Sequence, residues 1–299
     1  MEVTASQVKA LREKTGAGMM DCKTALVAAN GDMDGAVRHL REKGLATAAK
    51  RAGKVAAEGV IAARLTADGA AGVMLELNCE TDYVAKTPQF QELSAALLDA
   101  AGGLDSLSGA LGAEEAGLAE RKLANGKRVD DAVAEAIASL GESVVARRVA
   151  RLALPAGSGQ VGSYVHAGGK IGVLVEVKTT ATSPEIERLL RDLAMQIAAA
   201  NPRYVSREQV PAAEMERERE IYRVQARTTG KPEPVIERIV DGKIVKFYEE
   251  VCLVEQEFIR DPQLSVQKLI AGVASKVGAP ISVTRFVRFQ LGESSADAA

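Results

Sequence analysis

The sequence predicts an α+β protein that has an N-terminal three-helix module, two related core halves with small antiparallel sheets, and a projecting helical hairpin. Three patterns lead to this prediction: helical periodicity at the start of the chain, a strand–strand–helix order that occurs twice, and a polar helical stretch interrupted by Gly230-Lys231-Pro232. The chain has 299 residues, 47% of them hydrophobic, which is enough for about two domains with a sizeable core.

Three short helices are expected at the start of the chain. Thr4 and Gln7 form a capping-box pair, in which each side chain satisfies a backbone group of the other residue. Thr15-Gly16-Ala17-Gly18 is expected to end the first helix, Asn30-Gly31 the second and Gly44 the third. Because a bundle this small has little core of its own, we interpret it as a compact recognition module.

The repeated part of the chain predicts two related halves. Gly72-Val73-Met74-Leu75-Glu76 closely matches Gly172-Val173-Leu174-Val175-Glu176, and each segment follows another apolar segment and precedes an amphipathic helix. Between the halves, residues 114–123 and 130–140 are Ala-rich and expected to be helical. Residues 144–154 are expected to form a strand, although their three arginines leave a helix open.

A helical hairpin is expected after the second half. Its first helix lies in the very polar stretch Pro211–Arg227, and glycine followed by proline then suits the end of one helix and the first turn of the next. The second helix carries an apolar seam with coiled-coil spacing, made of Ile236, Val240, Ile244, Phe247 and Val251. A helix over 266–277, a strand over 283–291 and a disordered tail are expected to follow.

These patterns divide the chain into six segments. The expected boundaries are 1–45 for the three-helix partner-binding module, 46–57 for a linker, 58–143 for the N-terminal core half, 144–206 with 251–262 for the C-terminal core half, 207–250 for the hairpin, and 263–299 for a C-terminal module and tail. The linker is expected to be solvated and partly helical, because it carries several basic residues.

Composition and charge argue against several classes of protein. The net charge is −2, aromatic residues make up 3% and Trp is absent, so no direct contact with nucleic acid is expected. Three widely spaced cysteines are typical of a reducing compartment. No secretory leader and no apolar run of roughly 18 residues occur, so a soluble, cytoplasmic protein without membrane contact is expected.

The sequence shows no recognisable catalytic group. Its two histidines are His39 and His166, and neither has a nucleophile beside it in sequence. The cysteines lack the spacing of metal ligands, and the P-loop motif of nucleotide-binding proteins is absent. We therefore expect that the protein is not an enzyme and uses no cofactor or metal.

The segment Asn78–Val84 brings acidic, hydroxyl and aromatic groups together after an apolar strand. Two interpretations are open. In the first, which the chemistry alone favours, Thr81 or Asp82 caps a short turn and Tyr83 packs on the core. In the second, the segment is a probe that enters another protein, with an anionic group beside an apolar anchor.

Several motifs occur in order along nearly the whole chain. They are LREKTGAGMMDCK at 11–23, NCETDYVAK at 78–86, GSYVH at 162–166 with KIGVLV at 170–175, DLAMQIAA at 192–199 and FVRF at 286–289. Together they resemble the bacterial type of the translation elongation factor Ts family, and the first two are highly specific. The chain is identified from them as a member of this family.

The resemblance implies a function without bond chemistry. Members of the family bind elongation factor Tu, both with GDP and without nucleotide, and release its GDP so that GTP can load. Guanine-nucleotide exchange in translation is therefore expected, and the alternative is a non-catalytic scaffold or chaperone for a translation complex. The family is also compatible with a homodimer.

The resemblance further implies which residues bind the partner. Thr81, Asp82, Tyr83 and Val84 match the family motif Thr-Asp-Phe-Val, which is associated with disturbing the partner's Mg²⁺ site. Tyr83 stands where phenylalanine is usual, and its hydroxyl needs a hydrogen-bond partner or water when it is buried.

Two other regions are implied as partner contacts. The N-terminal helices look like a ubiquitin-associated-type domain, in which Arg12, Met19 and Met20 are expected to touch the partner's nucleotide domain. His166, in the C-terminal core half, is expected to contact a different domain of the partner.

Overall fold

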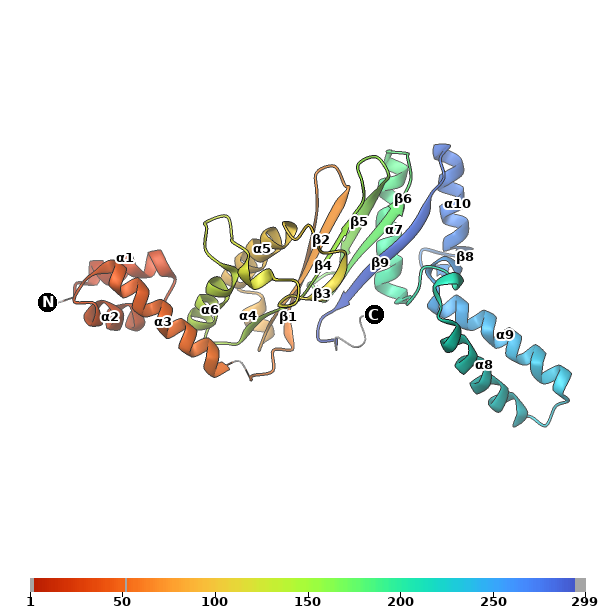
Figure 1. Ribbon diagram of the computed structural model, residues 1–299, viewed down its shortest axis with the longest axis horizontal. Helices are drawn as coiled ribbons and strands as arrows, with labels where there is room; N and C mark the ends of the chain where they lie inside the picture. Colours follow the sequence, from red (N-terminus) through yellow and green to blue (C-terminus); the bar gives the residue numbers. More distant parts are fainter. Residues whose placement is uncertain (1–2, 52, 294–299) are drawn as a thin grey trace.

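The computed structural model describes residues 3–51 and 53–293, which form an elongated molecule with helices at both ends and sheets in the middle (Figure 1). The helices are α1 (Ala5–Thr15), α2 (Met19–Ala28), α3 (Met33–Arg51), α4 (Asp82–Ala85), α5 (Pro88–Gly102), α6 (Val129–Leu140), α7 (Pro184–Ala200), α8 (Ala212–Arg227), α9 (Glu233–Val251) and α10 (Val266–Val277). The strands are β1 (Glu58–Leu65), β2 (Ala71–Cys79), β3 (Gly109–Gly112), β4 (Val144–Ala153), β5 (Gly159–Val165), β6 (Ile171–Lys178), β7 (Glu257–Phe258), β8 (Asp261–Ser265) and β9 (Ser282–Gln290). These elements confirm the predicted α+β class.

The N-terminal module follows the predicted capping signals. Thr4 Oγ1 accepts a hydrogen bond from Gln7 N, and Gln7 Oε1 accepts one from Thr4 N, which confirms the capping box. Gly16 ends α1 with a φ of +71°, a left-handed conformation that suits glycine. The expected helix end at Gly44 is wrong, because α3 continues to Arg51.

Packing against α6 explains why α3 passes through Gly44. Gly44 is buried, and a Cβ there would lie 3.5 Å from the carbonyl oxygen of Ala134 in α6. Arg41 of α3 also pairs with Asp131 of α6, with 2.6 Å between Nη2 and Oδ2. These contacts outweigh the helix propensity of glycine, which is about 1 kcal/mol worse than that of alanine. The expected linker is therefore helical at its start.

Two antiparallel sheets form the core. The first has the strand order β1-β2-β4-β3 and the second has the order β5-β6-β9, while β7 and β8 pair separately. The strands expected over 144–154 and 283–291 form as β4 and β9. Sheet membership does not follow the expected segment boundaries, because β4 lies in the first sheet and β9, from the expected C-terminal module, completes the second.

The segment between β3 and α6 departs from the predicted helix. Residues 114–123 form turns and a short 3₁₀ helix, η1 (Leu118–Glu120). Gly117 adopts a φ of +71°, which interrupts a right-handed helix at this point. The expectation for 130–140 is confirmed by α6. The tail expected to be disordered lies, from residue 294 on, outside the described residues.

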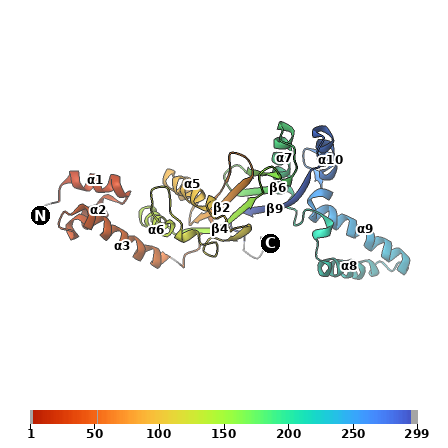
Figure 2. The ribbon, with the colours of Figure 1, turned by 45° about the horizontal axis from the view of Figure 1, so that its top comes forward.

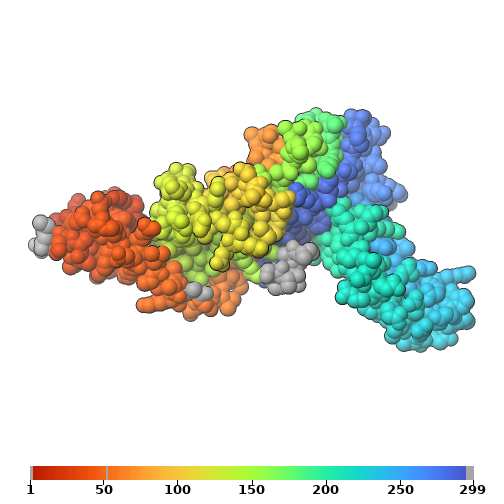
Figure 3. Space-filling model, in the orientation of Figure 1, coloured from red at the N-terminus to blue at the C-terminus, as the bar shows by residue number. Residues whose placement is uncertain are grey.

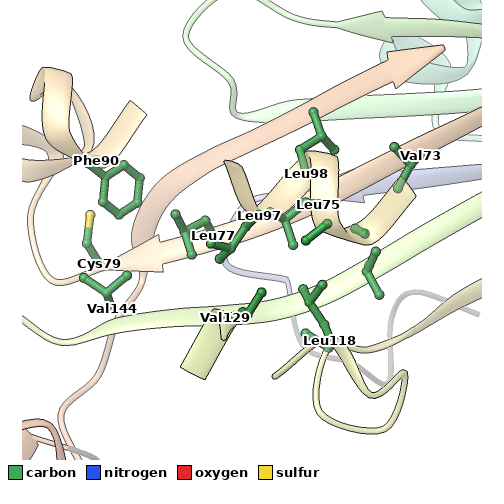
Figure 4. Close-up of a cluster of buried hydrophobic side chains, with 14 of the residues drawn as sticks. Val73, Leu75, Leu77, Cys79, Phe90, Leu97, Leu98, Leu118, Val129 and Val144 are labelled. Carbon is green, nitrogen blue, oxygen red and sulfur yellow. The ribbon is translucent and has the colours of Figure 1, made fainter. Parts of the chain in front are cut away.

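Helices cover the outer faces of both sheets. On the first sheet, alternate side chains of β2 pack with α5 and α6, as Figure 4 shows for Leu75, Leu77 and Cys79 beside Phe90 and Leu97. On the second sheet, alternate side chains of β6 pack with α7 and α10. None of the described helices combines the length and the apolar character that a bilayer crossing needs.

The helical hairpin of α8 and α9 projects from the body of the molecule at the end opposite the N-terminal module (Figures 2 and 3). The predicted seam is confirmed, because the buried residues of α9 are Ile236, Val240, Ile244, Phe247 and Val251. Met215 and Tyr222 of α8 pack against this seam. The predicted hairpin therefore holds its two helices together mainly through a narrow apolar strip.

The two sheets are joined by backbone hydrogen bonds that repeat from one half to the other, each from an edge strand of one sheet to the hairpin turn of the other. Ile61 N donates a hydrogen bond to Gly169 O at 2.7 Å, and Gly169 is the residue of the second half that corresponds to Gly69 of the first. In the reverse direction, Val161 N donates to Gly69 O at 2.8 Å. Each half thus makes on the other the contact that it receives, which gives the core an approximate two-fold symmetry and supports the predicted relation between the halves.

Glycines allow the two sheets to approach closely. A Cβ added at Gly72 would lie 3.0 Å from Val161 Cγ1. A Cβ added at the matching Gly172 would collide with Ile61 Cγ2 and would lie 2.8 Å from Met74 Sδ. Hydrogen atoms are therefore the only side chains that fit at these two positions without movement of the neighbours.

We expect Gly172→Ala to lower the free energy of unfolding by about 2 kcal/mol, because the added methyl group overpacks the contact between the sheets. The matched control is Gly242→Ala, at an exposed position of α9 where a Cβ meets nothing within 4 Å. The control should gain roughly 1 kcal/mol from better helix propensity. Urea denaturation followed by circular dichroism measures both, and equal effects would contradict the close contact.

Candidate functional site

The loop after β2 is a capped turn. Thr81 has extended backbone angles, and its Oγ1 accepts a hydrogen bond from Val84 N at 3.4 Å, so it caps the short helix α4. This confirms the cap in the first interpretation of the sequence. The rest of that interpretation is wrong, because the side chain expected on the core, Tyr83, is 78% exposed.

The loop has a buried anchor beside its exposed tip. Val84 is only 5% exposed and belongs to the cluster between the first sheet and α5. Cys79 lies in the same cluster, and its Sγ is 3.1 Å from Thr81 O, which accepts its hydrogen bond. Burial raises the pKa of the Cys79 thiol to about 11. Val84 and the cap thus fix a rigid base from which the ring of Tyr83 projects.

A lysine one helical turn away forms an ion pair with Asp82. Lys86 Nζ lies 2.6 Å from Asp82 Oδ2. The hydrogen bond and the charge of Lys86 lower the pKa of Asp82, and Asp82 raises the pKa of Lys86 in return. The carboxylate is thus exposed and ionised, and it is held by a partner that an incoming charged group would have to displace.

The structure brings Asp82 and His166 to one groove. The groove runs between α4 with β1 on one side and the turn 165–170 on the other, and Lys86 also lines it. The exposed ring of His166 is held by Tyr164, whose hydroxyl lies 2.9 Å from Nδ1. Two residues that are far apart in sequence therefore share one surface.

The residues expected in the N-terminal module form a separate surface. Met19 and Met20, in the first turn of α2, are 60% and 71% exposed, and Arg12 is exposed near the end of α1. Figure 1 places α1 and α2 at one end of the molecule and α4 in the core. The predicted residues therefore offer two contact regions on one chain.

Two residues near the loop were not singled out from the sequence. Lys86 follows Asp82 by four residues, a spacing at which helical ion pairs form, so the signal was present. Glu142 contacts Thr81 from a distant segment, and no local pattern indicates this contact. Within 3–51 and 53–293, no three His, Cys, Asp or Glu side chains gather in a way that would hold a metal ion.

Comparison with known proteins gives a consistent result. A family model described as "Elongation factor TS" matches residues 80–293. A protein named elongation factor Ts from Clostridium botulinum (strain Eklund 17B / Type B) is 46% identical over 291 residues, which cover 97% of this chain and 93% of that protein. The chain belongs to the elongation factor Ts family. It is therefore a translation elongation factor.

A second member of the elongation factor Ts family matches along almost its entire length. The protein of that name from Prosthecochloris aestuarii (strain DSM 271 / SK 413) is 44% identical over 293 residues, which cover 97% of this chain and 99% of that protein. The resemblance that the motifs indicated is thus confirmed over the N-terminal module, the core and the hairpin together.

We expect Lys86→Met to raise the pKa of Asp82 toward the usual range of an aspartate, because the substitution removes the main cause of its depression. A depressed pKa means that the ion pair forms fully above the ordinary aspartate pKa and is lost as the pH falls through the folded-state value. Carboxyl NMR titration measures the shift. The control Lys276→Met, at an exposed position of α10, should leave Asp82 unchanged, and an unchanged Asp82 in both variants would contradict the ion pair.

Proposed function

We propose that this chain is a guanine-nucleotide exchange factor of translation, which acts in the cytoplasm on elongation factor Tu and promotes release of its GDP. The observation that carries the proposal is an exposed aromatic tip, Tyr83, on a capped and anchored loop in a chain of the elongation factor Ts family. An exposed aromatic side chain on a rigid base is suited to fill a pocket in another protein.

Thermodynamic linkage provides the mechanism. A factor that binds the nucleotide-free partner more tightly than the GDP complex must weaken GDP binding by the same ratio. No covalent bond is formed or broken, so the proposal requires no catalytic residue and no cofactor. The interaction energy of the factor with its partner takes the place of the lost nucleotide contacts.

The loop supplies the contact that competes with the nucleotide. In this proposal the ring of Tyr83 enters between helices of the partner, with Thr81 and Val84 shaping and anchoring the turn. Asp82 acts on the hydrogen bonds or water shell of the partner's Mg²⁺. Because the ion bridges phosphate and protein, displacement of its ligands removes a large electrostatic contribution to GDP binding.

The other two contacts would hold the partner while the loop acts. The exposed pair Met19 and Met20, with Arg12, would bind the nucleotide domain, since methionine side chains adapt to varied apolar surfaces. His166 would contact a second domain of the partner across the groove. A homodimer, which stays a prediction, would present two sets of these contacts.

We expect Tyr83→Ala to slow GDP release from elongation factor Tu by roughly thirtyfold, the loss that corresponds to an aromatic anchor of about 2 kcal/mol. Tyr83→Phe keeps the ring and should retain full activity, and Asp82→Ala should lose part of it. Leu111→Ala, at another exposed apolar residue, is the matched control. Release of a fluorescent GDP analogue measures all four.

Two outcomes would contradict the proposal. If Asp82→Ala and Tyr83→Ala together leave the release rate unchanged, the loop is not the working part. If the unmodified chain accelerates release only in stoichiometric amounts, the scaffold or chaperone function is favoured, because an exchange factor turns over and acts when substoichiometric.

A further inference from the structure

Two carboxylates join the Tyr83 loop to the segment that follows α6. Glu142 Oε2 accepts a hydrogen bond from Thr81 N at 3.0 Å, and Glu142 Oε1 accepts one from Thr81 Oγ1 at 2.6 Å. In the reverse direction, Glu80 Oε1 accepts a hydrogen bond from Ser143 N at 2.7 Å. We call Glu80 and Glu142, with these bonds, the carboxylate clasp.

The carboxylate clasp begins where the backbone pairing of β2 and β4 ends. Cys79 and Val144 are the last paired residues of the two strands. Beyond these two residues, glutamate side chains take the place of backbone carbonyls as acceptors: Glu142 accepts from Thr81, and Glu80 accepts from Ser143. Because bonds from neutral donors to a carboxylate are stronger than those between neutral groups, the clasp extends the sheet connection up to the base of the loop.

Glu142 also sets the direction of the Thr81 hydroxyl. A hydroxyl group has one proton to donate and two lone pairs that accept. Since Thr81 Oγ1 donates its proton to Glu142, its lone pairs are left to accept from Val84 N, which is the capping bond of α4. The cap that holds the loop therefore depends on a residue 61 positions away in sequence.

Helix α3, which leads out of the N-terminal module, contributes a third arm. Arg51, the last residue of α3, donates from Nη1 to Glu80 Oε1 at 2.6 Å. The backbone hydrogen bond from Ser143 and the guanidinium of Arg51 lower the pKa of Glu80, which keeps it charged. The module that carries Met19 and Met20 is in this way tied to the base of the loop.

We propose that Glu142 is a positioning residue, which holds the Tyr83 loop in the conformation presented to the partner, and that Arg51 links the N-terminal module to the same clasp. The statement that the loop is presented to the partner rests on the proposed exchange function. A preordered loop reaches the partner without an ordering cost at the moment of insertion. Loss of the clasp should therefore slow nucleotide release more than it weakens initial binding.

The first test uses the free protein and needs no partner. Glu142→Ala should accelerate amide hydrogen exchange of residues 81–86 about tenfold, the effect of losing bonds to a charged acceptor. Glu142→Gln keeps an acceptor oxygen without the charge, so its amide exchange rates should lie between those of the unmodified chain and those of Glu142→Ala. Arg51→Ala should accelerate the same amides less. Glu92→Ala, an exposed glutamate of α5 outside the clasp, is the matched control and should match the unmodified chain.

The second test separates positioning from a general structural role. With melting temperature shown to be unchanged, Glu142→Ala should lower the maximal rate of GDP release from elongation factor Tu about tenfold, while the half-saturating concentration changes little. Unchanged amide exchange at 81–86 would overturn the clasp. Loosened amides with an unchanged maximal rate would overturn the positioning role. Failure of the unmodified chain to release GDP would instead overturn the exchange function, while the amide result would still decide whether the clasp holds the loop.

Discussion

The contact between the inner faces of the two sheets is the constraint on which the other features depend. Gly72 and Gly172 let the sheets approach to a distance at which Ile61 N can bond to Gly169 O. That bond holds the turn 165–170 beside β1, and α4 follows directly from the neighbouring strand β2. His166 and Asp82 share a groove for this reason, so the site is a product of sheet packing more than of any local motif.

Local sequence patterns were sufficient to predict an element where that element's own residues determine its conformation or its buried face. The seam of α9, the capping box at Thr4 and the repeated strand–strand–helix order all formed as predicted. The predictions for Gly44 and for sheet membership failed because a distant segment decided the outcome. Gly44 reads as a helix end, yet α6 supplies a surface on which only a small residue lets α3 lie. The strand order could not be predicted from the sequence either, because nothing in the sequence of β4 determines which of the two sheets it joins.

The candidate site shows the same division. The hydroxyl of Thr81 before a short helix is a local signal, and the cap was among the interpretations. The sequence left two interpretations of Tyr83 open, packed on the core or presented to a partner, and no local signal decides between them. Glu142 was invisible because its bond to Thr81 exists only after β2 and β4 have paired. The family motif identified the tip of the loop but not the residues that hold it.

The approximate two-fold symmetry of the core places one kind of ion pair in two different surroundings. Glu76 pairs with Arg148 across a bulge of β2, and Glu176 pairs with Arg285 across the matching bulge of β6. Arg148 lies over the ring of Phe289, whereas Arg285 donates a hydrogen bond to Ser108 Oγ. The chain thus carries the same ion pair twice, on matching strands but among different neighbours. The same substitution made in each pair would therefore compare the two surroundings while the chemistry and the strand geometry stay constant.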